Sequence, residues 1–197
     1  MKEMTPLPNT TVPATTTSSG VTSVPSPDVM EFFEDAVVRL RDYGPLRVGA
    51  RVDDLQREFG IILSEGECPP VFGIGNGPSN VSVMVNGERV SRITIVEPTS
   101  NPDDPINSNP ILGVTTLSGV AFGSTKQQVM ATYGDQVILE AIPGDEMSPD
   151  GERRLTFVPR DEVDAHLRLI FTLDDQDRVS NMRTGVIDAV QKEEPCV

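Results

Sequence analysis

The chain has 197 residues, of which 30 are acidic and 16 are basic, so its formal net charge is −14. This length suits one large core or two small cores packed together. An acidic surface of this kind repels phosphate backbones and anionic membranes, so we expect no nucleic-acid partner. No apolar run of about 18 residues occurs, and we therefore expect no transmembrane segment.

Residues 1–27 differ in composition from the rest of the chain. Thr, Ser and Pro predominate between positions 5 and 27, and no side chain there is charged. Because such a segment has little to bury, it cannot offset its ordering entropy, and we predict a disordered tether. Tethers of this kind often follow the cleavage site of exported proteins or lipoproteins. Either an export signal and a lipid anchor lie upstream of this sequence or the protein is cytosolic, and we favour the exported form.

The segment that follows the tether has apolar residues at positions 29, 32, 33, 36, 37 and 40. This spacing predicts a helix over residues 28–41, with Asp28 as its cap. The end of the segment, residues 37–41, equally fits a strand that leads into the next motif. Both interpretations stay open.

A short pattern then occurs twice, 74 positions apart. The first copy, Gly44–Gly49, precedes a predicted helix over residues 51–59. The second copy, Ser118–Gly123, precedes a helix that ends at Tyr133. Periodicity of this kind indicates that one supersecondary unit is used twice.

Both predicted helices have local start or stop signals. Ser124 followed by Gln127 is typical of a capping box. Gly60 and Gly134 lie where a left-handed residue would end each helix.

Strands are predicted after each helix. Residues 81–85 alternate, Asn86-Gly87 favours a type I′ turn, and the chain returns over 89–96. In the second unit the expected strands are Leu155–Val158, Ala165–Leu173 and, after a turn at Asp174–Asp177, Arg178–Val186. Arg89-Val-Ser-Arg-Ile matches Arg178-Val-Ser-Asn-Met 89 positions later, so the second unit carries about 15 extra residues, which we place in 143–152.

These elements predict an α+β protein of two tandem helix-plus-antiparallel-sheet repeats that form one curved sheet. The expected boundaries are residues 1–27 for the tether, 28–100 for the first repeat, 101–110 for a linker and 111–197 for the second repeat.

The two cysteines are Cys68 and Cys196. A bridge between them would close a loop of about 128 residues and contribute on the order of 4–5 kcal/mol in the chain-entropy model. We predict this disulfide, which favours an oxidising compartment, and the alternative is two free thiols. One histidine and two distant cysteines cannot assemble a closed metal site, so we expect neither a metal nor a cofactor.

The two glycine motifs, together with the intervening Cys68, hairpin and Thr/Ser/Pro tether, resemble those of exported bacterial tandem-repeat proteins, which are mostly uncharacterised lipoproteins. Their repeat is similar to that of the β-lactamase inhibitor protein and, more distantly, to the small lipoproteins of outer-membrane assembly. The resemblance covers residues 37–197 and implies two helix-plus-sheet units side by side, with a concave sheet face available to a target. No inhibitory loop residue matches, so none is carried over.

Other motifs favour structural roles. Gly73–Gly77 precedes a predicted strand rather than a helix, so we interpret it as a turn and not a phosphate loop. His166 has no visible nucleophile or orienting acid, and we expect a sheet-surface residue. The acidic clusters at 103–104, 145–146 and 174–177 lack the EF-hand spacing and favour turns over calcium ligands.

We therefore expect no catalytic residues. The predicted function is a non-catalytic, exported protein-interaction module of the cell envelope. An enzyme inhibitor is one form that such a module can take. Its expected partner is an unknown envelope or extracellular protein. The alternative is a small-ligand-binding or hydrolytic protein that uses a cleft between the repeats.

The disulfide hypothesis predicts the result of a thiol-labelling experiment. Intact mass after treatment with an alkylating reagent is expected to show no label on Cys68 or Cys196 before reduction and one label on each after it. Two labels on the unreduced, denatured protein would establish free thiols instead.

Overall fold

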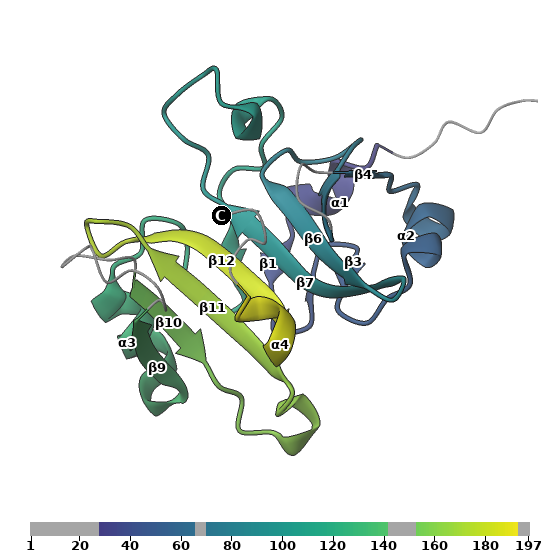
Figure 1. Ribbon diagram of the computed structural model, residues 1–197. Coiled ribbons are helices and arrows are strands. Elements are labelled where there is room, and N and C mark those ends of the chain that lie inside the picture. The colour runs from purple at the N-terminus through teal and green to yellow at the C-terminus, as the bar shows by residue number, and fades with distance from the viewer. Residues whose placement is uncertain (1–27, 66–69, 142–152, 193–197) are drawn as a thin grey trace, which may run out of the picture.

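The computed structural model describes residues 28–65, 70–141 and 153–192, and it is a mixed α+β fold in which strands predominate (Figure 1). The α-helices of these stretches are α1 (Glu31–Glu34), α2 (Val52–Phe59), α3 (Lys126–Tyr133) and α4 (Ile187–Val190). Short 3₁₀ turns are η1 (Pro105–Asn107), η2 (Gly134–Gln136) and η3 (Glu162–Asp164). The expected α+β class is confirmed. The tether, Cys68 and Cys196 lie outside the described residues.

One eight-stranded antiparallel sheet forms the centre of the molecule, in the order β4-β5-β6-β7-β12-β11-β10-β9. Its strands are β4 (Leu63–Glu65), β5 (Val71–Ile74), β6 (Val81–Asn86), β7 (Arg89–Val96), β9 (Val137–Ala141), β10 (Arg153–Phe157), β11 (Leu167–Leu173) and β12 (Val179–Val186). Each half of the sheet is a meander of four consecutive strands that follows an eight-residue helix. The halves join where β7 pairs with β12, with Thr94 opposite Arg183.

A second, smaller sheet has the order β3-β2-β1-β8. Its strands are β1 (Val37–Val38), β2 (Asp42–Tyr43), β3 (Leu46–Arg47) and β8 (Thr115–Thr116). The pairing of β1 with β8 is parallel, with Val37 opposite Thr115. This sheet therefore joins the segment before α2 to the segment before α3.

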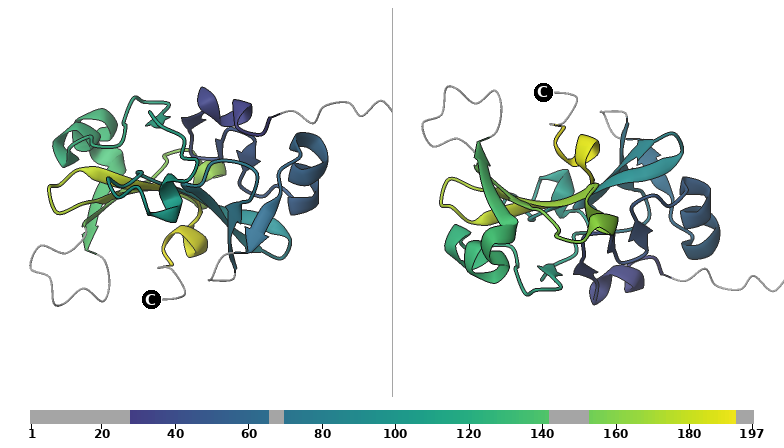
Figure 2. Two further views of the ribbon diagram at one scale, coloured as in Figure 1. Left: turned by 90° about the horizontal axis from the view of Figure 1, so that it is seen from above. Right: turned by 90° about the horizontal axis from the view of Figure 1, so that it is seen from below.

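The large sheet is curved, with α1 and α3 on one side and α4 on the other, toward which both ends of the sheet bend (Figure 2). The hydrophobic core fills the side that carries α1, α2 and α3. Fully buried members from both halves include Phe33, Leu46, Ile93, Ile95, Phe171 and Leu173. The core is continuous across the β7–β12 junction, because these residues belong to one cluster.

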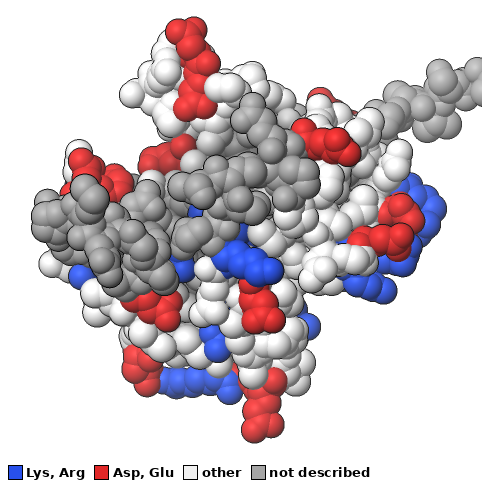
Figure 3. All heavy atoms as spheres, in the orientation of Figure 1, with Lys and Arg blue, Asp and Glu red and all other residues white. Residues whose placement is uncertain are grey.

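The opposite face of the sheet is polar but also buried. Arg92 and Thr94 alternate with core residues on β7, yet they are only 0% and 3% exposed. Arg92 Nη1 donates to the carbonyls of Ala189 (3.4 Å) and Lys192 (3.0 Å), at α4 and directly after it. On the face that carries α4, the visible acidic and basic side chains are interspersed (Figure 3).

The predicted β6–β7 hairpin is present, but its turn lies one residue later than expected. Asn86 pairs with Arg89, so the two central residues are Gly87 and Glu88, with φ of 54° and 66°. Positive φ at both positions is what a type I′ turn requires. The shift follows a register irregularity between Met84 and Val85.

The start of α3 is also displaced by one residue from the prediction. The capping box is formed by Thr125 and Gln128, not by Ser124 and Gln127: Gln128 N donates to Thr125 Oγ1 at 3.3 Å, and Thr125 N donates to Gln128 Oε1 at 2.8 Å. Ser124 Oγ instead accepts from Ala121 N (3.0 Å) and closes the preceding turn.

The helix stops differ from each other. Gly60 ends α2 in the left-handed conformation, as expected. Gly134 has positive φ but an extended ψ of −133°, and it begins η2 rather than a left-handed cap.

At residues 28–41 the chain combines the two interpretations that the sequence left open. The helix is one turn, α1, and residues 37–38 form strand β1, because they pair with both β2 and β8. The expected strand 165–173 begins later, at Leu167, after η3, which Asp161 caps through Val163 N (3.0 Å). The expected insertion at 143–152 lies outside the described part of the chain.

The segment predicted as a linker packs against the first half of the sheet. Ser79 Oγ donates to the carbonyl of Ile106 at 2.7 Å, within η1. Asn80 is 3% exposed, and its side chain both donates to and accepts from the backbone of Ile111 (3.1 and 2.9 Å).

The β7–β12 junction predicts a severe effect for Gly185→Ala. Gly185 lies opposite Arg92, and an added Cβ would lie 2.3 Å from the carbonyl oxygen of Ser91 and 2.8 Å from Arg92 Cα. Since both obstacles are backbone atoms, we expect a loss of about 2–4 kcal/mol in the free energy of unfolding, measured by denaturant titration. Gly75→Ala is the matched control, because the nearest atom is 3.4 Å away. Equal stability of both variants would contradict the packing described for the junction.

Candidate functional site

A groove of about 820 Å³ lies between α1, the β2–β3 hairpin and α2. This volume is within the range of known ligand sites, about 300–1,000 Å³. Its apolar lining is contributed mainly by Phe32, Ala36, Val48, Ala50, Leu55 and Phe59. These residues come from three separate segments of the first half, so the groove exists only once the chain is folded.

One wall of the groove is helix α2. Leu55 faces the core and is 2% exposed, while Phe59, one turn later, is half-buried. Asp54 and Glu58 lie one turn apart and both line the groove. The wall thus presents an apolar stripe with a carboxylate pair beside it.

The other wall is α1 and the residues directly after it. Glu31 and Asp35 are spaced by four residues, as are the carboxylates of the facing wall, and both line the groove. Phe32 meets Phe59 edge-on, with ring centroids 5.5 Å apart and an interplanar angle of 81°. This aromatic pair joins the two walls.

The tight β2–β3 turn brings the floor of the groove close to α1. Gly44 has φ of 57°, and a Cβ there would lie 2.8 Å from the carbonyl oxygen of Phe32. Only glycine suits this position, because the backbone is left-handed and the approach is too close for a side chain. Nearby, Tyr43 is fully buried, and burial raises the pKa of its phenol, so this ring packs rather than exchanges protons.

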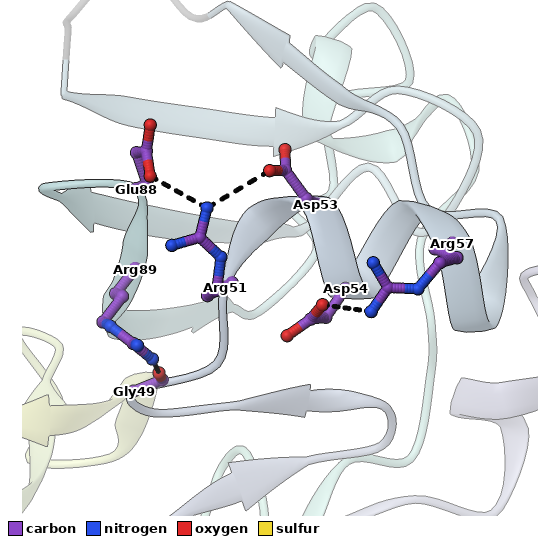
Figure 4. A network of polar contacts seen from close by, with 7 residues as sticks. All are labelled: Gly49, Arg51, Asp53, Asp54, Arg57, Glu88 and Arg89. Carbon is purple, nitrogen blue, oxygen red and sulfur yellow. Dashed lines mark hydrogen bonds and ion pairs between the residues drawn. The ribbon is translucent and has the colours of Figure 1, made fainter.

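A polar network fixes α2 against the β6–β7 hairpin (Figure 4). Arg51 Nη2 contacts the carboxylates of Asp53 (3.3 Å) and Glu88 (3.0 Å). Both carboxylates raise the pKa of the Arg51 guanidinium, the hydrogen bond to Asp53 most strongly. On the other side of the helix, Asp54 forms an ion pair with Arg57.

The motif glycine of the first half contacts the start of β7 through two hydrogen bonds. Gly49 N donates to the carbonyl of Val90 (2.7 Å), and Arg89 Nη1 donates to the carbonyl of Gly49 (2.6 Å). We call this pair of bonds the glycine–arginine contact. It holds the loop before α2 against the large sheet and thereby positions the α2 wall.

The second half has the same contact at the matching positions. Gly123 N donates to the carbonyl of Val179 (2.9 Å), and Arg178 Nη1 donates to the carbonyl of Gly123 (2.9 Å). The residue before the arginine, Asp177, has φ of 57°, as Glu88 has φ of 66° in the first half.

The groove has an excess of negative charge. Four carboxylates and two guanidinium groups, those of Arg39 and Arg47, line it. Arg39 donates to Asp42 Oδ1 at 3.0 Å and is therefore partly neutralised. Among the described residues, Glu31 and Asp35 belong to no ion pair. The unpaired carboxylates favour a cationic ligand.

A second hollow, of about 400 Å³, lies between the two halves. Leu40 of the first half faces Leu117, Tyr133 and Phe157 of the second across it. The hydroxyl of Tyr133 already donates to Thr116 Oγ1 at 2.9 Å. The alternative function predicted from the sequence would use a hollow in this position.

The structure places the sequence-derived candidates apart from both hollows. His166 is exposed just before β11 and lines neither hollow, and its carbonyl accepts from Ile187 N (3.1 Å). Within Gly73–Gly77, the Asn76 side chain bonds the backbone of Gly60 and Ile62, both at 2.9 Å. The turn prediction holds only for Gly75–Gly77, because Gly73 and Ile74 belong to strand β5, where Gly73 pairs with Ser82. Through Asn76 this turn ties the end of α2 to the sheet.

The acidic clusters also act in turns where they are described. Asp104 Oδ1 accepts from Ile106 N (3.1 Å), and Asp174 Oδ1 accepts from the amides of Gln176 (2.9 Å) and Arg178 (2.8 Å). The cluster at 145–146 is outside the described residues. Within the three described stretches, no three His, Cys, Asp or Glu side chains gather as metal ligands do.

The sequence analysis missed the groove. Its signal was present as two carboxylate pairs at helical spacing, Glu31/Asp35 and Asp54/Glu58. That both pairs line one groove depends on the hairpin between them, which brings the walls together.

No family model and no curated protein matches the sequence. Among solved structures, the chain is similar to an extracellular protein containing a SCP domain from Bacillus anthracis str. Ames, with a TM-score of 0.37 and 8% sequence identity. The match covers 73% of this chain but 45% of that one, so the chain spans less than half of its length. At this TM-score the likeness carries no argument. Separately, none of the helices in the described stretches is long and apolar enough to cross a bilayer.

The glycine–arginine contact predicts matched effects for Arg89→Met and Arg178→Met. Each substitution removes the donor to a motif-glycine carbonyl but keeps an apolar stem, so each is expected to lower the free energy of unfolding by about 1 kcal/mol in denaturant titration. The control is Arg160→Met, which removes only an exposed ion pair with Asp135 and should cost less than about 0.5 kcal/mol. A cost in one half and none in the other would contradict the equivalence of the two contacts.

Proposed function

We propose that this chain is a non-catalytic protein-interaction module and that the groove between α1 and α2 is its binding site. The observation that carries the proposal is the lining of that groove, an apolar floor with carboxylates on both walls. Protein-binding sites combine an apolar surface with a few charged groups around it. The apolar part supplies affinity, and the charges orient the partner.

The matching contacts of the two halves support a further part of the proposal, that each half is a copy of one unit. In both, an eight-residue helix precedes a four-stranded meander. The glycine–arginine contact joins corresponding positions, Gly49 with Arg89 and Gly123 with Arg178. Similar hydrogen bonds at offsets of 74 and 89 positions favour duplication over coincidence.

The proposed site differs from the one that the family resemblance implies. In that resemblance the concave sheet face receives the target. Here three arginines of that face, Arg92, Arg154 and Arg183, are only 0%, 4% and 8% exposed. The groove walls, in contrast, carry the exposed carboxylates of Glu31, Asp35 and Glu58. Accessibility therefore favours the helical side of the molecule.

We propose an exported location, outside the cytoplasm or at the cell envelope. The support is compositional: a Thr/Ser/Pro-rich segment over residues 1–27 and two cysteines, Cys68 and Cys196, that suit a single long-range bridge. The groove does not depend on this location.

The hollow between the two halves supports a second candidate function, the binding of a small apolar ligand. Leu40, Leu117 and Phe157 give it an apolar lining, with Arg160 and Asp164 at its polar part. Its volume of about 400 Å³ suits a small molecule rather than a protein segment. A hydrolytic role would need a nucleophile and a base, for which the described lining offers the Ser118 hydroxyl and the carboxylates of Asp161 and Asp164.

The test is a crosslinking pull-down from envelope extract of the source cells, with the whole chain as bait and mass spectrometry as the readout. The groove variant is Asp35→Lys with Glu58→Lys, which reverses one exposed carboxylate on each wall. The control variant is Glu34→Lys with Asp175→Lys, which makes the same charge change at exposed positions outside the groove.

One protein captured near-stoichiometrically by the native chain and by the control variant, but reduced at least about tenfold with the groove variant, is the expected result. Equal capture by both variants would show that the interface lies outside the groove. If nothing is enriched over a no-bait sample, the interaction proposal fails, and the small-ligand candidate is tested next by metabolite screening.

A further inference from the structure

We infer that the groove binds a basic amphipathic segment of a partner protein, with an apolar side chain on the Phe32–Phe59 pair and Lys or Arg side chains on the two carboxylate walls. This inference rests on the proposed function and names its partner class.

The first argument is the placement of the carboxylates. Glu31 and Asp35 on one wall, and Asp54 and Glu58 on the other, are each spaced by four residues. In α2 this spacing places Asp54 and Glu58 on the same helix face, about 5–6 Å apart at Cβ. Asp35 directly follows α1 and lines the groove together with Glu31. A cationic side chain that enters the groove therefore meets carboxylates on both sides rather than a single point charge.

The second argument is the apolar floor between these walls. Phe32 and Phe59 are half-buried and meet edge-on, so each leaves ring surface in contact with the groove. Val48 and Ala50 continue this apolar surface and are half-buried as well. An apolar anchor gains by burial here, and an adjacent cation gains from the aromatic faces.

The third argument concerns which cations the groove already contains. Of the two lining guanidinium groups, Arg39 is engaged by Asp42, whereas Arg47 has no ion-pair partner among the described residues. Arg57, outside the lining, is engaged by Asp54 and Glu58, so the free carboxylates are those of the α1 wall. Glu31 and Asp35 have no ion-pair partner among the described residues. A free carboxylate pair beside an apolar surface is complementary to a basic amphipathic segment.

Charge also disfavours two other occupants. A second copy of this chain would bring a net charge of −14 to an acidic groove. The uncharged residues 5–27 would supply no cation to the walls. A basic amphipathic partner can contact both parts of the groove. Its apolar side chain packs on the floor, and its basic side chains pair with wall carboxylates that face solvent in the free protein.

The test is fluorescence anisotropy with the whole chain and three labelled synthetic peptides of equal length. The first alternates leucine and lysine pairs, the second replaces every lysine with glutamate, and the third replaces every leucine with serine. We expect the leucine–lysine peptide to bind at physiological ionic strength and each of the other two to bind at least about tenfold more weakly.

The same peptide is then titrated against the two charge variants. Affinity is expected to fall at least about tenfold with Asp35→Lys/Glu58→Lys and to change less than about twofold with Glu34→Lys/Asp175→Lys, although both have the same net charge. All four changed positions are exposed or at a groove rim, and circular dichroism melts check that both variants stay folded.

Four results would overturn the inference. Equal losses in the two variants would mean non-specific attraction to an acidic protein. Equal binding of the serine–lysine peptide, or full competition by spermine, would mean a cation site without an apolar anchor. Failure of every peptide would remove the partner class. The proposed function would still stand in that last case if the pull-down yields a groove-dependent partner, because that partner would then engage the groove through other chemistry.

Discussion

The antiparallel pairing of β7 with β12 is the constraint on which the rest of the structure depends. These strands end the two halves of the chain, and their pairing converts two four-stranded meanders into one sheet with a continuous core. Without it, each meander would expose a long strand edge, which proteins normally cover. The junction is buried on both faces, by Ile93 and Ile95 on one side and Arg92 on the other, so it tolerates little change in volume or register.

The glycine–arginine contact fixes the loop before each helix, and thus the helix itself, relative to the sheet. Gly49 is bound by Val90 and Arg89 at the start of β7, so the loop before α2 cannot move independently of the central strands. On the other wall, the close approach of Gly44 to Phe32 sets the distance between the β2–β3 hairpin and α1. Backbone contacts therefore help to shape the groove.

Charge is divided between the two sides of the molecule. Arginines on the sheet face are buried, and the guanidinium of Arg92 is bound to backbone carbonyls at α4. Carboxylates of the groove walls face solvent instead. A buried charge must be satisfied inside the protein, whereas an exposed charge is free to pair with a partner, which is why the proposed site lies on the groove side. The proposals above follow from this division.

The sequence by itself determined the elements that depend on near neighbours: the α+β class, helix α2 with its stop at Gly60, and the β6–β7 hairpin. Tertiary contacts then decided the details. The hairpin turn falls on Gly87-Glu88, where the Glu88 carbonyl accepts from Val52 N. Of the helix and strand interpretations that stayed open for residues 37–41, pairing with β2 and β8 selects the strand at Val37–Val38. Patterns among near neighbours in the sequence could not predict the groove, because its walls are separated in sequence by the β2–β3 hairpin. Only folding brings their carboxylates to one groove, because spacing within a helix fixes which side chains share a surface but not what that surface meets.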